Sequence, residues 1–292
     1  MVKNNIPKVG FIGAGTVGTA LATLLASKGY QVVAVSSRST GSAEKLSQAV
    51  SGCRVNENPQ DTVEAADLIF ITTPDDAIAD VASSLKWRRG KSVVHCSGAA
   101  STDILETARR AGAMVGTIHP LQTLAGVKEA IENIPGSTFG IEGEEPLLGT
   151  LKEMARSLGG HPIELKAQDK VVYHAAAVMA CNYLVTLIKT ATDLWKTFNV
   201  PTDQATQALM PLIRGTVHNI DTIGIPNCLT GPIARGDTGT IKKHITSLEQ
   251  ASPDVLSLYR QLGLHTIPVS LDKGKINEAQ AKALEDILKQ LD

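Results

Sequence analysis

Aromatic side chains are scarce in this chain, and no sign of charge is in excess. Phe, Trp and Tyr make up 3% of the 292 residues, and the formal net charge is −1. Proteins that bind nucleic acid need stacking platforms and a basic surface, so the composition argues against a nucleic-acid partner. The same balance gives no attraction to an anionic membrane. With 43% hydrophobic and 20% charged residues, the chain is expected to be globular.

Closely spaced cysteines are also lacking. The four cysteines are Cys53, Cys96, Cys181 and Cys228, and no two of them form a C-x-x-C pair. This spacing predicts neither a metal knuckle nor a redox motif, so we expect reduced thiols and no metal. Residues 1–8 contain no apolar core of the signal-peptide type, and we expect a cytoplasmic protein.

Formal charge is absent from residues 171–188, a length close to that of a membrane span. The segment contains His174 and Asn182 and is flanked by Lys170 and Lys189. We therefore interpret it as a helix buried between domains or subunits, with no membrane partner. Because one small helical domain would not cover it on all sides, we expect a homodimer formed through the C-terminal part of the chain.

A glycine pattern near the start is the most informative feature that is present. The pattern G-x-G-x-x-G consists of Gly13, Ala14, Gly15, Thr16, Val17 and Gly18. It follows the apolar run 9–12 and precedes a helical segment, 19–28, and a strand, 31–35. In this context the glycines allow a tight turn, approach of the backbone to a pyrophosphate, and helix packing. The pattern predicts a dinucleotide site, with a purely structural turn as the alternative.

The end of the second strand indicates which dinucleotide is bound. Sites that prefer NAD carry an acidic residue about 20 residues beyond the glycines. This chain instead has Ser36, Ser37, Arg38 and Ser39. A guanidinium and several hydroxyls suit the 2′-phosphate of NADP, so we predict NADP(H) as the cofactor. The alternative for Arg38 is a solvated loop cation.

Strands and helices alternate over the first half of the chain. Further strands are expected at 68–72, 92–95, 115–119, 137–141 and 162–165, and helices at 41–50, 75–85, 102–111 and 145–158. Beyond this half, helices are expected at 169–198, 202–217, 240–249, 253–262 and 277–291. The pattern predicts an α/β Rossmann domain with a doubly wound, mostly parallel sheet over residues 1–166, followed by an all-α substrate and dimerisation domain over 167–292.

Polar residues follow three of the expected strands. They are Thr72, Thr73, Pro74, Cys96, Ser97 and His119. Ligands of open parallel sheets lie beyond the carboxyl ends of the strands, so the first five are expected to contact the cofactor. His119 is our candidate for moving a proton at the reacting atom, with Ser97 as its helper. A structural role for His119 remains the alternative.

The first 165 or so residues resemble the cofactor domain shared by prephenate dehydrogenases, pyrroline-5-carboxylate reductases and 6-phosphogluconate dehydrogenases. Ser97, followed 22 residues later by His119-Pro120, is similar to the serine and His-Pro pair of prephenate dehydrogenases. This resemblance implies that His119 engages the reacting hydroxyl of the substrate and that Ser97 supports it.

Residues 119–123, 173–177, 181–184 and 229–237 resemble a family of Rossmann-like NADP oxidoreductases with a C-terminal domain of unknown function, of the DUF2520 type. Related 3-hydroxyacid dehydrogenases carry a catalytic lysine four residues before an asparagine. If Asn182 is that asparagine, Val178 stands at the lysine position.

Two residues of the 171–188 helix and one later arginine are further candidates for the site. His174 and Asn182 are about two helical turns apart, which is roughly 12 Å, and are expected to line a substrate cleft. A buried hydrogen-bonded role is the alternative for both. Arg235 either binds a substrate carboxylate or pairs with Asp237.

These observations predict an NADP(H)-dependent oxidoreductase acting on a small polar carbonyl, imine or alcohol, with hydride transferred to or from the substrate. Because Val178 replaces the lysine of the related dehydrogenases, a regulatory protein that binds NADP(H) without catalysis remains the alternative.

Overall fold

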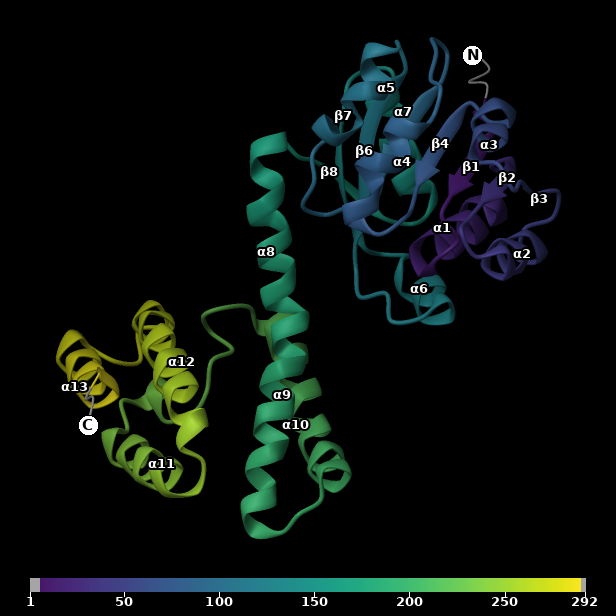
Figure 1. Cartoon of the computed structure of the whole chain (residues 1–292). Helices are drawn as coiled ribbons and strands as arrows, with labels where there is room; N and C mark the ends of the chain where they lie inside the picture. Colours follow the sequence, from purple (N-terminus) through teal and green to yellow (C-terminus); the bar gives the residue numbers. More distant parts are fainter. Residues whose placement is uncertain (1–5, 290–292) are drawn as a thin grey trace. The chain divides into compact units, whose positions relative to one another are not determined.

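The computed structural model describes residues 6–289 and divides into two compact units, residues 1–181 and 182–292. The first unit contains a sheet covered by helices, and the second is entirely helical (Figure 1). The α/β fold class with a helical C-terminal part is therefore confirmed. The domain boundary expected at residues 166 and 167 stays a prediction.

The first unit is built on an eight-stranded sheet with the order β3-β2-β1-β4-β5-β6-β7-β8. The strands are β1 (Val9–Ile12), β2 (Val32–Ser36), β3 (Arg54–Val55), β4 (Leu68–Ile71), β5 (Ser92–His95), β6 (Met114–Leu121), β7 (Thr138–Gly143) and β8 (His161–Glu164). Only β6 and β7 pair antiparallel. All four residues of β1, β4 and β5 are buried, as expected for strands covered on both faces.

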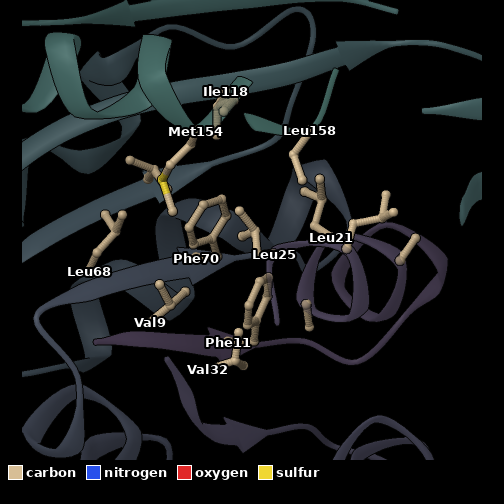
Figure 2. Close-up of a cluster of buried hydrophobic side chains, with 14 of the residues drawn as sticks. Val9, Phe11, Leu21, Leu25, Val32, Leu68, Phe70, Ile118, Met154 and Leu158 are labelled. Carbon is tan, nitrogen blue, oxygen red and sulfur yellow. The ribbon is translucent and has the colours of Figure 1, made fainter. Parts of the chain in front are cut away.

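Helices cover both faces of this sheet. They are α1 (Thr16–Ser27), α2 (Thr40–Ala49), α3 (Pro59–Ala65), α4 (Ile78–Ser84), α5 (Glu106–Arg110), α6 (Val127–Asn133) and α7 (Leu147–Ser157). The next helix, α8 (Lys170–Ala180), follows β8 and has Lys170 as its buried residue. Side chains of α1, α2, α6 and α7 form one core with Phe11 and Phe70, whose rings stack at 5.0 Å (Figure 2). Side chains of α3, α4 and α5 form a second core with Ile69 and Val93.

The second unit has its own core. Its helices are α9 (Asn182–Leu194), α10 (Thr202–Ile223), α11 (Thr238–Ala251), α12 (Pro253–Asp272) and α13 (Glu278–Lys289). Nine buried residues of the last three helices and their connections form this core, among them Ile241, Ile267 and Leu284. The helices are amphipathic, and burial of their apolar stripes stabilises the unit.

Several expected element bounds differ from those observed. The single helix expected over 169–198 is divided at Cys181, where φ −112° and ψ −66° distort the helical geometry between α8 and α9. The helix expected to end at Leu262 continues to Asp272 through Pro268, although proline removes one backbone hydrogen bond. The short elements β3, α3 and α6 were not expected.

Candidate functional site

The glycine loop joins β1 to α1 and leaves backbone open to a ligand. Gly13 has φ +108°, and a Cβ there would lie 2.7 Å from the carbonyl carbon of Thr72. A Cβ on Gly18 would lie 2.5 Å from the carbonyl oxygen of Gly13, whereas one on Gly15 would meet nothing within 4 Å. Gly13 therefore makes the turn, Gly18 allows the close packing, and Gly15 faces open space at the start of α1.

A cavity of about 370 Å³ lies beside this loop, which is within the size range of small-molecule sites. Among the expected cofactor residues, it is lined by Gly13, Ala14, Gly15, Ser36, Ser37, Arg38, Ser39, Thr72, Thr73 and Pro74. The expected residues Thr16, Val17, Gly18, Cys96 and Ser97 do not line it. Pro59, Val81 and Ser84, which the sequence did not single out, close its other side.

Two hydroxyl oxygens in this cavity, Ser36 Oγ and Thr73 Oγ1, are buried without a hydrogen-bond partner among residues 6–289. Such groups are rare in native proteins and are commonly satisfied by a ligand. Arg38 is exposed and forms no ion pair within residues 6–289. Hydroxyls and a free guanidinium around a glycine loop suit a phosphorylated dinucleotide, so these residues fit NADP(H).

Ser97, at the end of β5, is held by its own neighbours. Its hydroxyl donates to Asp75 Oδ2, and its Oγ accepts from the amide of Ala100 at 3.1 Å. Nearby His95 accepts from the Ser97 amide through Nδ1, and its Nε2 hydrogen-bonds the carbonyl of Ser101. Within residues 6–289, these hydrogen bonds order the end of β5 and none of them joins Ser97 to His119. The role of Ser97 as the helper of His119 stays a prediction.

His119, on β6, lies against two side chains of α8. Its Nδ1 is 2.8 Å from the hydroxyl of Tyr173, and its ring meets that of His174 edge-on at 5.9 Å. A Cβ on Gly98 would lie 2.9 Å from His119 Nε2 and 2.5 Å from His174 Nδ1. Two imidazoles and a phenol thus converge beside a glycine. His174 Nδ1 is buried and has no hydrogen-bond partner in the described part of the chain.

Burial keeps His119 neutral. Desolvation lowers the pKa of His119 to about 4, and the charges of His174 and Lys170 act in the same direction, against a smaller raising by Asp75. At pH 7 the imidazolium is therefore scarcely populated. His119 is therefore a neutral hydrogen-bonding group at that pH, and its role in proton transfer stays a prediction.

Lys170, at the start of α8, is a residue that the sequence analysis missed. Its side chain is fully buried, and Nζ donates to Thr117 Oγ1 at 2.7 Å and lies 3.8 Å from Glu142 Oε2. Desolvation lowers the pKa of Lys170 to about 8, against raising by Glu142, so the side chain stays mainly protonated at pH 7. A buried cation held near an imidazole is a candidate functional group.

The spacing between Lys170 and His174 is the sequence signal that could have indicated Lys170 as a functional residue. Lys170 stands four residues before His174, which is the separation that the related dehydrogenases use between lysine and asparagine. Matching the asparagine to Asn182 instead places Val178 at the lysine position. Because residues four apart share one helix face, Lys170 and His174 both reach the sheet from α8.

Asn182 and Arg235 belong to the second unit. Asn182 is the first residue of α9 and is exposed. Arg235 is exposed and lies 4.0 Å from Asp237, whose carboxylate caps α11 by accepting from the amide of Thr240. Arg235 and Asp237 thus form a weak ion pair. The placement of Asn182 and Arg235 near the substrate stays a prediction.

Metal-ligand clusters were also sought. Within residues 6–289, no group of three or more His, Cys, Asp or Glu side chains is arranged to hold a metal ion. All four cysteines are free thiols.

Family models match two parts of the chain. Residues 2–120 match a Rossmann-like domain, and residues 137–266 match DUF2520, a domain of unknown function. The chain joins a Rossmann-like domain to a DUF2520 domain. No curated protein matches it. The DUF2520 match begins within the sheet, just before β7, and includes Tyr173 and His174.

Solved structures share this architecture over nearly the whole chain. A candidate NADP oxidoreductase from Bacteroides fragilis is 25% identical with a TM-score of 0.70, covering 92% of this chain and 98% of its own. A reductive aminase from Aspergillus terreus, in complex with NADPH and ethyl-5-oxohexanoate, is 16% identical with a TM-score of 0.62, covering 98% and 93%. A 1-pyrroline-5-carboxylate reductase from Streptococcus pyogenes is 17% identical with a TM-score of 0.62, covering 96% and 98%. Because the last two structures are only 16% and 17% identical to this chain, their similarity shows the fold alone.

Proposed function

We propose that this protein is an NADP(H)-dependent oxidoreductase that transfers hydride to or from a small polar carbonyl, imine or alcohol. The observation that carries the proposal is the cavity at the strand ends, where Arg38 and the unpaired hydroxyls of Ser36 and Thr73 surround a glycine loop. The Bacteroides fragilis relative, described as an NADP oxidoreductase, and the NADPH complex of the reductive aminase support the choice of cofactor.

Each part of the cavity suits one part of the cofactor. The open backbone at Gly15 and the start of α1 would hold the pyrophosphate, because amide groups and the helix dipole favour anions there. Ser37, Arg38 and Ser39 would hold the 2′-phosphate. Thr72, Thr73 and Pro74 would contact the part of the cofactor that leads from the pyrophosphate to the nicotinamide. When bound, the nicotinamide supplies or accepts a hydride.

The cluster around His119 supplies the remaining chemistry. His119 Nε2 would hydrogen-bond the reacting heteroatom, and the buried charge of Lys170 would favour negative charge developing there. The alternative, a regulatory protein that binds NADP(H) without catalysis, has as its motive that Val178 stands where the related dehydrogenases have a lysine. Lys170 weakens that motive, because it provides a buried lysine four residues before His174.

Replacement of Arg38 by alanine tests the 2′-phosphate contact. We expect Arg38→Ala to weaken NADPH binding by about 10- to 100-fold, since hydrogen bonds to charged groups contribute roughly 1.5–3 kcal/mol. The affinity for NADH, which lacks the phosphate, should change less than about twofold. Arg54→Ala, an exposed arginine that does not line the cavity, is the matched control. Calorimetric titrations that show equal losses for both cofactors would contradict a contact between Arg38 and the 2′-phosphate.

We also propose that a second copy of the chain covers the long apolar helical stretch. The helical stretch 167–198 is long and apolar enough to cross a membrane. In its most apolar window of 18 residues, no residue is buried. Val172, Met179 and Val185 are each at least 65% exposed. Apolar patches of this kind mark interfaces, and a cytoplasmic homodimer would cover them without a membrane.

Light scattering of the full chain tests this assembly. We expect a homodimer at micromolar concentration, because the exposed apolar side chains of α8 and α9 need a partner surface. Val185→Glu should shift the equilibrium toward monomer, whereas Thr186→Glu, one position along the same helix, should do so less. A wild-type chain that is monomeric without detergent would contradict the proposal, as would membrane association of the expressed protein.

A further inference from the structure

The hydrogen bond between His119 and Tyr173 has a direction that matters for the chemistry at the opposite ring nitrogen. The bond joins β6 to α8, with Nδ1 and the phenol oxygen 2.8 Å apart and the two rings edge-on at 87°. If the phenol donates, neutral His119 carries its proton on Nε2. If Nδ1 donates, Nε2 is a bare lone pair.

The surroundings of the phenol oxygen decide between these two arrangements. Tyr173 Oη lies against Gly140 of β7, where a Cβ would be only 2.9 Å from it. A backbone hydrogen bond with Gly140 lowers the pKa of Tyr173. Burial outweighs this contact and raises the pKa to about 12, which keeps the phenol protonated.

The phenol proton therefore needs an acceptor. Within residues 6–289, the hydrogen bond that the geometry gives the Tyr173 hydroxyl is the one with Nδ1 of His119. Were Nδ1 the donor in this bond, the phenol proton would have no partner. Buried donors are seldom left unpaired, so the phenol donates to Nδ1 of His119.

His119 Nε2 is the free edge of this arrangement. It has no hydrogen-bond partner within residues 6–289, and it is not among their fully buried, partnerless polar atoms. Gly98 leaves it uncovered, because a Cβ at that position would lie 2.9 Å away. A ligand group that approaches this edge meets an N–H donor.

We propose that Tyr173 is a positioning residue that fixes His119 as the Nε2–H tautomer, and that the pair relays a proton to the carbonyl oxygen of a substrate. The relay rests on the proposed function, whereas the tautomer does not. A carbonyl oxygen offers lone pairs to Nε2–H. The nitrogen of a charged iminium has an N–H and no lone pair, so it cannot accept a hydrogen bond from Nε2–H. The Nε2–H tautomer of His119 therefore favours reduction of a carbonyl.

The proton movements balance without an imidazolium. Hydride addition to the carbonyl carbon moves the C=O π electron pair onto the oxygen, which takes the proton of Nε2. Nδ1 then takes the proton of Tyr173, and the phenolate takes a proton from solvent. Because an alkoxide is far more basic than a phenolate, the relay runs toward the alcohol.

Nitrogen-15 NMR of the histidine-labelled full chain tests the tautomer without cofactor or substrate. Seven histidines are present, and His119 is assigned from the signal lost in His119→Gln. We expect wild-type His119 to show a protonated Nε2 and an accepting Nδ1, unchanged from pH 6 to 8. Tyr173→Phe should lose this single-tautomer pattern.

A second histidine–tyrosine pair provides the matched control. In the second unit, His244 Nδ1 lies 2.8 Å from the hydroxyl of Tyr259, so Tyr259→Phe removes the same kind of hydroxyl without touching His119. The proposal is overturned if wild-type His119 is protonated on Nδ1, or if folded Tyr173→Phe keeps the wild-type pattern. Should Tyr173→Phe not fold, the wild-type spectrum decides. Failure of the chain to bind NADPH would sink the proposed function and leave the tautomer standing.

Discussion

Gly15→Leu is expected to weaken NADPH binding by at least about 100-fold while the chain remains folded. The structure makes Gly15 the cleanest glycine to test. A Cβ there meets nothing within 4 Å, so the new side chain enters the space beside the start of α1 without displacing protein atoms. That space is where the pyrophosphate is expected, and a leucine would exclude it. Calorimetry with NADPH measures the loss, and circular dichroism confirms the fold.

Two other variants calibrate this result. Gly215→Leu places the same side chain on α10 of the second unit, where a Cβ also meets nothing within 4 Å, and should leave NADPH binding unchanged. Gly13→Leu is the less informative variant, because φ +108° and the backbone at Thr72 would strain the turn itself. Wild-type affinity in folded Gly15→Leu would place the cofactor elsewhere.

The second large effect is expected in His119→Ala. On the substrate that the enzyme turns over, kcat should fall by about 10²- to 10⁴-fold, the usual range for loss of a group that moves a proton. The Kd for NADPH should stay within about twofold of wild type, because His119 does not line the cofactor cavity. Steady-state kinetics and calorimetry together separate the two effects.

The pH profile adds a further check on His119. Because burial lowers its pKa to about 4, wild-type kcat should show no ionisation of His119 between pH 6 and 8. His161→Ala, an exposed histidine of β8, is the control and should leave kcat unchanged. If His119→Ala keeps the wild-type rate, His119 has only a structural role.

Local patterns predicted the cofactor cavity well. The glycine loop, the polar end of β2 and the residues after β4 are each continuous in sequence, and strand alternation places them at one edge of the sheet. Pro59, Val81 and Ser84 were not predicted, because their approach to the cavity depends on how α3 and α4 pack.

The cluster around His119 was predicted only in part. Its defining contacts join β6 to α8 across more than 50 residues of sequence, as in the bonds from Thr117 to Lys170 and from His119 to Tyr173. Helical periodicity shows that these α8 residues share one end of a helix. It does not show which strand they meet, nor that Cys181 ends the helix there. The reversal of β7, which brings Gly140 to the Tyr173 hydroxyl, has no signal in the hydrophobic pattern.

Calorimetric titration of the wild-type chain with NADPH and, separately, with NADH tests the central claim most directly. The glycine loop, the unpaired hydroxyls of Ser36 and Thr73, and the free guanidinium of Arg38 predict saturable binding of NADPH that is at least about tenfold tighter than that of NADH. Equal or tighter binding of NADH would contradict the assignment of the 2′-phosphate site, and no binding of either cofactor would contradict the proposed function.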